Sequence, residues 1–191
     1  MKKFLFIIIL LINFQANLNA EIVRILSGNK NAKITIIAYE SLTCSHCANF
    51  HKDVYPKLKK DYIDTGLVKL EFRHYPLDIA AFNAAKISQC KPEQSLEILE
   101  SLYSNQQAWV KGSNVEEVNE NLKKFLINEG FKINYEICIE NKEIEDFVLN
   151  DRIEGVKKFK VNATPTIIIN DKKFEKSLNY KNLKKTLEKL I

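Results

Sequence analysis

Two cysteines separated by two residues constrain this chain most, because of what stands on either side of them. The stretch Lys33–Tyr39 (KITIIAY) is rich in β-branched residues and predicts a buried strand. Cys44-Ser45-His46-Cys47 comes shortly after it. The apolar residues that follow recur at helical spacing: Phe50, Val54, Leu58 and Tyr62. The two thiols are therefore expected at the N-terminus of a helix that leaves a central strand.

A thiol in that position has an unusual chemistry. Unpaired N–H groups and the positive end of the helix dipole favour the thiolate over the thiol. We therefore expect Cys44 to be an exposed nucleophile, with His46 adding a charge or a donor beside its sulfur. Cys47, one turn deeper, is expected to form and open a redox-active disulfide with Cys44.

Two other interpretations of the pair are weaker. Zinc needs four ligands, but Cys90 and Cys138 are far apart in the sequence and the other histidines are His51 and His74. No metal and no cofactor is therefore expected. A purely structural disulfide would close too short a loop to restrain the unfolded chain appreciably.

The order of the remaining elements indicates an α/β fold. Val68, Leu70 and Phe72 alternate with charged residues and predict a second strand, and Pro56 is expected to kink the helix before it. Residues 78–160 show only helical signals, including a capping box from Ser113 to Glu116. We therefore expect a mixed sheet interrupted by a long helical insertion.

The C-terminal part completes the predicted sheet. Thr166–Ile169 is a short apolar strand, and Asn170-Asp171 is a turn after which Lys173–Lys176 can pair back. A closing amphipathic helix follows, with an apolar face formed by Leu183, Leu187 and Leu190.

The first twenty residues have the pattern of a secretory signal. Lys2 and Lys3 precede the apolar run Phe4–Phe14, and Leu18-Asn19-Ala20 resembles a cleavage site. An uncleaved anchor is the alternative. The chain has 29 basic and 24 acidic side chains without a dense basic block, so nucleic acid is not an expected partner.

In these features the chain resembles the DsbA-like thiol-disulfide oxidoreductases of the thioredoxin superfamily. The matching motifs are the active-site helix start, Arg73-His74-Tyr75-Pro76 and Val161-Asn162-Ala163-Thr164-Pro165-Thr166. The resemblance implies a thioredoxin fold with an inserted helical domain. We divide the chain into a signal peptide (1–20), a first thioredoxin-like part (21–77), the insertion (78–150) and a second thioredoxin-like part (151–191).

The resemblance also implies roles for single residues. Pro165 is expected to be cis beside the active site, and Thr164 to offer backbone groups to a substrate peptide. Four cysteines allow three pairings; the helix-start context favours Cys44 with Cys47, which leaves Cys90 with Cys138 for a structural disulfide. Some members of the family carry such a second bond.

One departure from the family concerns an acid that related proteins often carry six residues before the first active-site cysteine. Here that position is Ala38, and Glu40 lies on the same face of the expected strand. Glu40 could replace the acid or lie in water at the strand end. His51 is expected on an exposed or half-exposed helix side, His74 at a strand end and Trp109 in the core.

The expected function is that of a monomeric, exported oxidase in the periplasm. By resemblance, it would introduce disulfides into reduced or misfolded exported proteins and be reoxidised by a membrane quinone-linked partner of the DsbB type. Two alternatives remain: a reductase or isomerase of the same compartment, and a chaperone-like binding protein with an incidental disulfide.

Overall fold

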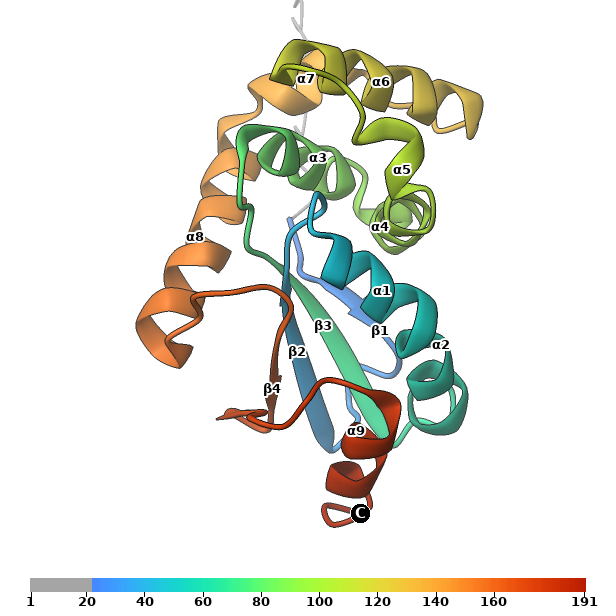
Figure 1. Cartoon of the computed structure of the whole chain (residues 1–191), viewed down its shortest axis with the longest axis vertical. Helices are drawn as coiled ribbons and strands as arrows, with labels where there is room; N and C mark the ends of the chain where they lie inside the picture. The colour runs from blue at the N-terminus through green and yellow to red at the C-terminus, as the bar shows by residue number, and fades with distance from the viewer. Residues whose placement is uncertain (1–21) are drawn as a thin grey trace, which may run out of the picture.

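The computed structural model describes residues 22–191, which form a mixed five-stranded sheet with helices on both faces (Figure 1). The strand order is β1-β3-β2-β4-β5. Only β2 and β3 are parallel; the other neighbours are antiparallel. The strands are β1 (Ile25–Ser27), β2 (Ile34–Glu40), β3 (Val68–His74), β4 (Thr166–Ile169) and β5 (Lys172–Lys173).

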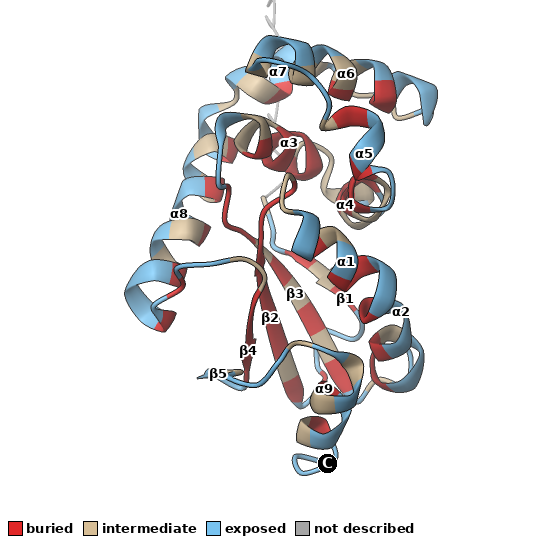
Figure 2. Ribbon diagram, in the orientation of Figure 1, coloured by how far each residue is buried: buried red, intermediate tan, exposed pale blue. Residues whose placement is uncertain are grey.

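Alternating residues of the central strand β2 supply two cores, one on each face of the sheet. Ile36 and Ala38 belong to the larger core, together with side chains of α1 (Ser45–Asp53), α2 (Tyr55–Leu58) and α9 (Tyr180–Leu187). Ile37 and Tyr39 belong to the smaller core with Phe159 at the end of α8 (Lys142–Phe159). Figure 2 shows the resulting red band of buried residues along the sheet. Glu40, two residues after Ala38, therefore shares the α1 face.

A layer of helices covers the end of the sheet at which β2 and β3 finish (Figure 1). Trp109 is fully buried among these helices and donates to the carbonyl of Leu102. The next helix, α8, runs continuously through the expected domain boundary at 150/151. The layer contains α3 (Ile79–Gln89), η2 (Pro92–Gln94), α4 (Ser95–Ser104), α5 (Gln106–Trp109), α6 (Val115–Asn128) and α7 (Tyr135–Glu140).

The fold class and most elements agree with the sequence analysis. The thioredoxin-like sheet with a helical insertion is confirmed, and β3 alternates between fully and partly buried residues. The first helix breaks at Val54, and Pro56 lies in the first turn of α2. Backbone N–H groups in a first turn have no acceptor within the helix, so a proline, which lacks this N–H, is tolerated there. A π-helical turn, η1 (Lys59–Ile63), completes this segment.

Three expectations need correction, and one strand was not expected. β1 was not predicted, since it has three residues and depends on pairing with β3. The N-cap of α6 is Asn114, whose side chain accepts from the Glu117 N–H, and not Ser113. β5 ends at Lys173, although Phe174 still donates to the Ile167 carbonyl. Leu190 lies beyond α9 and is 46% exposed, so it is not part of the apolar face.

Two features of the sequence concern membranes and metals. The signal peptide expected in residues 1–20 lies outside the described residues. In residues 22–191, no helix has the length and apolar character needed to cross a membrane. The same residues contain no group of three or more His, Cys, Asp or Glu side chains arranged to hold a metal ion.

Candidate functional site

Cys44 and Cys47 lie at the start of α1, just beyond the end of β2. Cys44 is the N-cap residue, and its carbonyl accepts from the N–H groups of Cys47 and Ala48 at 3.1 Å each. Both cysteines are free thiols. Cys44 is half-buried, less exposed than expected, whereas Cys47 is fully buried. One sulfur is thus accessible to a reactant and its partner lies beneath it.

The surroundings of the Cys44 sulfur lower its pKa to about 5. The largest cause is a hydrogen bond with the Cys47 thiol, partly opposed by burial; the backbone N–H groups of Cys47 and His46 add to the effect. Each of these donors stabilises a negative sulfur. At neutral pH Cys44 is therefore a thiolate.

Cys47 behaves in the opposite way. Burial raises its pKa above that of an ordinary thiol, and the hydrogen bond with Cys44 and the charge of Glu40 raise it further. Charging a buried sulfur close to other negative charges is unfavourable. Cys47 consequently keeps its proton when the pair is reduced.

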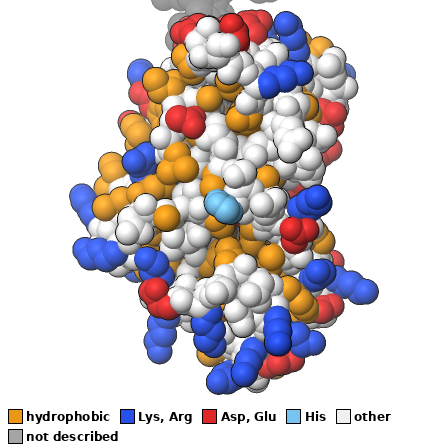
Figure 3. Space-filling model, viewed as in Figure 1, with side chains coloured by type: hydrophobic (Ala, Val, Ile, Leu, Met, Phe, Trp, Pro, Cys, Tyr) orange, Lys and Arg blue, Asp and Glu red, His pale blue; other side chains and the backbone are white. Residues whose placement is uncertain are grey.

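His46 acts through its backbone in this arrangement. Its side chain is exposed, and Figure 3 shows a histidine side chain in the middle of the face in view, with apolar side chains nearby. The groups that lower the Cys44 pKa include the His46 N–H. A charge or a donor was expected from His46, and its backbone N–H is the donor that lowers the Cys44 pKa.

Thr164 and Pro165 lie beside the thiols, and the peptide bond between them is cis. Cys44 Sγ lies 3.4 Å from the Thr164 carbonyl oxygen, to which the thiol donates when it is protonated. The Thr164 hydroxyl is buried and has no hydrogen-bond partner among the described residues. A cavity of about 430 Å³ borders both residues and His46 and continues to Leu178 and Asn179. This loop and α1 together form the walls of a groove that begins at His46, two residues after Cys44.

Glu40 and His51 form a buried pair on the α1 face of the sheet. His51 Nε2 and Glu40 Oε2 are 2.9 Å apart, and the residues are 7% and 3% exposed. The expectation of an exposed or half-exposed His51 was therefore wrong, as was the alternative of Glu40 in water. The helix turns His51 inward, and only the tertiary structure brings a strand carboxylate opposite it.

His74 also lies deeper than its strand-end position suggests. The side chain is buried and hydrogen-bonded to the Gln89 amide at 3.0 Å. Burial lowers the His74 pKa to about 4, so the imidazole is neutral at pH 7.

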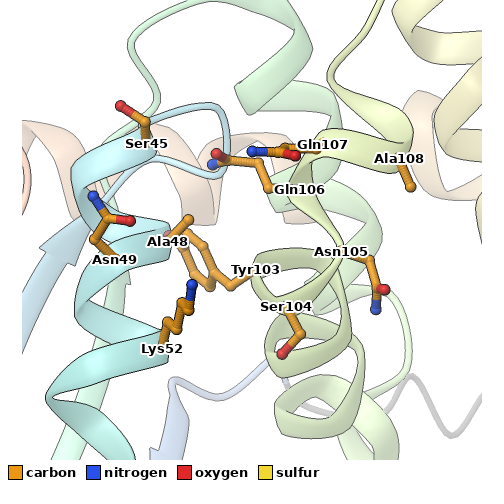
Figure 4. A pocket seen from close by; sticks show the side chains of 10 residues that line it. All are labelled: Ser45, Ala48, Asn49, Lys52, Tyr103, Ser104, Asn105, Gln106, Gln107 and Ala108. Atoms are coloured by element: carbon orange, nitrogen blue, oxygen red, sulfur yellow. The ribbon is translucent and has the colours of Figure 1, made fainter.

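Gln106 of the helical insertion was missed by the sequence analysis. Its amide nitrogen donates to the carbonyls of Leu42 and Cys44 at 2.8 and 3.1 Å. Figure 4 shows Gln106 beside a cavity of about 580 Å³ between α1 and the α4–α5 segment, with Tyr103 extending toward Ala48. No local motif marks Gln106, because its partners are 62 and 64 residues away.

Cys90 and Cys138 are joined by a disulfide within the insertion. Their Cα atoms are 5.6 Å apart, and the two residues are separated by 48 positions. Cys90 caps the C-terminus of α3 and Cys138 lies in α7. The bond therefore connects two helices of the same layer.

Comparisons with known proteins agree on one family. The thioredoxin family model, described as "Thioredoxin", matches residues 21–189. Disulfide bond formation protein D of Bacillus subtilis is 28% identical over 169 residues, which are 85% of this chain and 74% of that protein. A Rickettsia prowazekii relative named among the protein-disulfide oxidoreductases is 38% identical over 64 residues, but these are only 24% of its own length.

Solved structures match over most of the chain. The crystal structure of Wolbachia pipientis alpha-DsbA1 has a TM-score of 0.77 and 32% identity, covering 86% of this chain and 89% of that one. Oxidised BdbD from Bacillus subtilis has a TM-score of 0.68 and 26% identity, covering 87% and 91%.

Proposed function

The chain belongs to the DsbA-like thiol-disulfide oxidoreductases of the thioredoxin superfamily, and from this membership we propose that it is an exported oxidase. Thiol-disulfide exchange is common to the family. The direction, the compartment and the partners are the subject of the proposal.

The environment of Cys44 is the observation that supports oxidation as the direction of the exchange. The Cys47 thiol and the N–H groups of Cys47 and His46 stabilise its thiolate, and a thiolate exists only in the reduced enzyme. Whatever stabilises the reduced form relative to the disulfide makes the disulfide a stronger oxidant. The Cys44–Cys47 disulfide would therefore be passed to a substrate.

The reaction proceeds in two exchanges. A substrate thiolate attacks Cys44 Sγ of the enzyme disulfide, the S–S bond to Cys47 breaks, and Cys47 leaves with the electron pair and takes up a proton. A second substrate thiolate then attacks the substrate sulfur of the mixed disulfide, and Cys44 leaves as its stabilised thiolate. The substrate loses two electrons and the enzyme gains them.

The residues around the thiols would position the substrate. In the proposal, Thr164 and the cis-Pro165 loop offer main-chain groups to an extended peptide, and the cavity reaching Leu178 accepts its side chains. The substrates are reduced or misfolded exported proteins. A membrane quinone-linked protein of the DsbB type would reoxidise the enzyme, which acts as a monomer.

Export to the periplasm is supported by two features. The first is the signal-like pattern of residues 1–20. The second is the Cys90–Cys138 disulfide, since such bonds persist in oxidising compartments. Cell fractionation and mass measurement test this part: we expect periplasmic protein that lacks residues 1–20, and a cytoplasmic, full-length protein would contradict it.

The reduction potential of the Cys44–Cys47 pair tests the direction. After equilibration in glutathione buffers, an oxidase is expected to show a potential more oxidising than about −180 mV. A potential near about −270 mV would instead indicate a reductase that needs a source of electrons. A pair that does not titrate would leave only the binding role.

Variants of the two cysteines provide the control for that measurement. Cys44→Ser is expected to abolish oxidation of a reduced peptide, whereas Cys47→Ser is expected to accumulate mixed disulfides on Cys44. Oxidation that survives in Cys44→Ser would exclude the proposed nucleophile.

A further inference from the structure

The exchange site combines two loops that lie beyond the ends of the paired strands. The Cys44 sulfur is 3.4 Å from the Thr164 carbonyl oxygen, although the two residues are 120 positions apart. The antiparallel pairing of β2 with β4 ends at Tyr39 and Thr166. Contacts outside this pairing must therefore fix the distance between the sulfur and the segment around Thr164, which we call the proline loop (residues 161–165).

Tyr75, the first residue after β3, contacts both sides of the site. Its main-chain N–H donates to the Glu40 carbonyl at the end of β2 at 2.7 Å. Its hydroxyl donates to the Val161 carbonyl at the start of the proline loop at 3.1 Å. Tyr75 and Val161 are 6% and 2% exposed, so this second hydrogen bond is shielded from water. A buried carbonyl needs a donor, and the Tyr75 hydroxyl is that donor.

Arg152 of α8 holds the Tyr75 ring in the orientation that the hydroxyl needs. Its guanidinium lies over the ring, 4.8 Å from the ring centroid, and Nη1 donates to the carbonyl of Pro76. A cation over the ring face, bonded to the next residue of the chain, leaves the ring little freedom to turn. The hydroxyl is therefore kept directed at the proline loop.

The proline loop is stiffened from within. The Val161 N–H donates to the Gly155 carbonyl at 3.1 Å, which ties the start of the loop to α8. The Thr166 hydroxyl donates to the Ala163 carbonyl at 2.7 Å, which ties its other end to β4. The few residues between these bonds leave little room to absorb a displacement. A shift at Val161 is therefore expected to move Thr164 as well.

The segment after β3 also holds the loop that precedes α1. The Leu77 N–H donates to the Ser41 hydroxyl at 3.3 Å. The Thr43 hydroxyl donates to one carboxylate oxygen of Asp78 at 2.7 Å, and the other oxygen of Asp78 caps α3. This short segment thus connects the helical insertion, the loop that carries the thiols and the proline loop.

We propose that Tyr75 is a positioning residue of the exchange reaction: its hydroxyl, steadied by Arg152, fixes the Thr164 main chain beside the reactive sulfur, where a substrate peptide binds. Main-chain groups that are already fixed need not be ordered when the peptide binds. This inference rests on the proposed role of Thr164 in peptide binding and holds for either direction of the exchange. A small dithiol does not span the proline loop and should not depend on Tyr75.

Two reductants of the oxidised protein separate peptide binding from the chemistry of the sulfurs. One is an unstructured peptide with two cysteine thiols, and the other is dithiothreitol; each becomes a disulfide while the Cys44–Cys47 disulfide takes up two electrons. We expect Tyr75→Phe, which keeps the ring and loses the hydroxyl, to lower the second-order rate constant with the peptide by about tenfold. The rate constant with dithiothreitol should stay at the wild-type value.

Two further variants complete the experiment. Tyr55→Phe is the matched control, because Tyr55 is 5% exposed and its hydroxyl bonds Ser27 and Glu100 at 2.8 and 2.6 Å, with these partners in β1 and α4. It should react with both reductants at the wild-type rates. Arg152→Gln keeps the hydroxyl but frees the ring, and should slow only the peptide reaction, by less than Tyr75→Phe. It takes the place of Tyr75→Phe if that variant does not fold.

The ratio of the peptide rate constant to the dithiothreitol rate constant decides the outcome. A lower ratio in the Tyr75 variant supports the positioning role. A wild-type ratio overturns it, whether both rate constants are unchanged or both fall together, since an equal fall indicates a general disturbance of the thiol site. A wild-type protein that oxidises neither reductant would contradict the exchange activity itself, and the positioning role with it.

Discussion

Cys44 and Cys47 show how three residues of sequence separation can give opposite acid–base behaviour. The N-cap position exposes Cys44 to N–H donors, whereas the next turn places Cys47 in a fully buried site near Glu40. The same residue type is therefore a thiolate in one place and a thiol in the other, because hydrogen bonding dominates at Cys44 and burial dominates at Cys47.

This difference predicts the alkylation behaviour of the reduced protein. The rate of Cys44 alkylation by iodoacetamide should follow a titration with a midpoint near pH 5, because only the thiolate reacts. Cys47 should remain unmodified in the folded state. The measurement is the alkylation rate against pH with mass-spectrometric assignment of the site; a midpoint close to pH 9 would contradict the assigned donors.

At the scale of elements, α5 connects the insertion to the active-site loop. Gln106→Leu removes both amide hydrogen bonds to the Leu42 and Cys44 carbonyls, and should lower the free energy of unfolding by about 1–3 kcal/mol. It should also change the rate of Cys44 alkylation. Urea denaturation measures the first effect, with exposed Gln107→Leu as the control, which should differ from wild type by less than about 0.5 kcal/mol.

The link between α3 and α7 yields a second prediction at this scale. Replacing Cys90 and Cys138 together by alanine should lower the free energy of unfolding by about 3–4 kcal/mol, because the closed loop no longer restrains the unfolded chain. Urea denaturation of variant and wild type without reductant gives the value. Comparison of the same two proteins under reducing conditions is the control, and an equally large difference there would show that packing, not the bond, is responsible.

At the scale of the whole molecule, the low Cys44 pKa couples redox state to stability. The Cys44 pKa is about 5 in the folded protein and near 9.0 for an unperturbed thiol. Between these values the unfolded reduced chain binds more protons than the folded one, so the stability of the reduced form rises with pH and is lost as pH falls toward 5. The raised pKa of Cys47 acts only above this window.

The reduced protein should consequently have a higher melting temperature than the oxidised protein at pH 8. This difference in melting temperature, the gap between the two forms, should become smaller toward pH 5. The oxidised protein has no Cys44 thiol to titrate, so it serves as the reference in the same scans. Thermal unfolding of both forms at the two pH values measures the gap. A gap that does not depend on pH would contradict the coupling between thiolate and fold.

The sequence by itself determined the elements whose signals are local. Runs of β-branched residues predicted β2 and β4, and helical periodicity predicted the helices of the insertion. The Cys-x-x-Cys pattern after a strand predicted the thiol site. The three-residue strand β1, the Asn114 cap and the exposed Leu190 were not predicted, because pairing partners and competing caps decide them. Local pattern specifies a helix or strand, but its last residues depend on neighbours.

The tertiary structure alone decided which distant groups meet. Glu40, His51 and Tyr103 come from a strand and two helices, and Gln106 reaches the active-site loop from the insertion. None of these residues carries a motif, since burial and hydrogen bonding over long sequence separations leave no periodic trace. The sequence thus identified the reacting sulfurs, and the packing around them determined their charge.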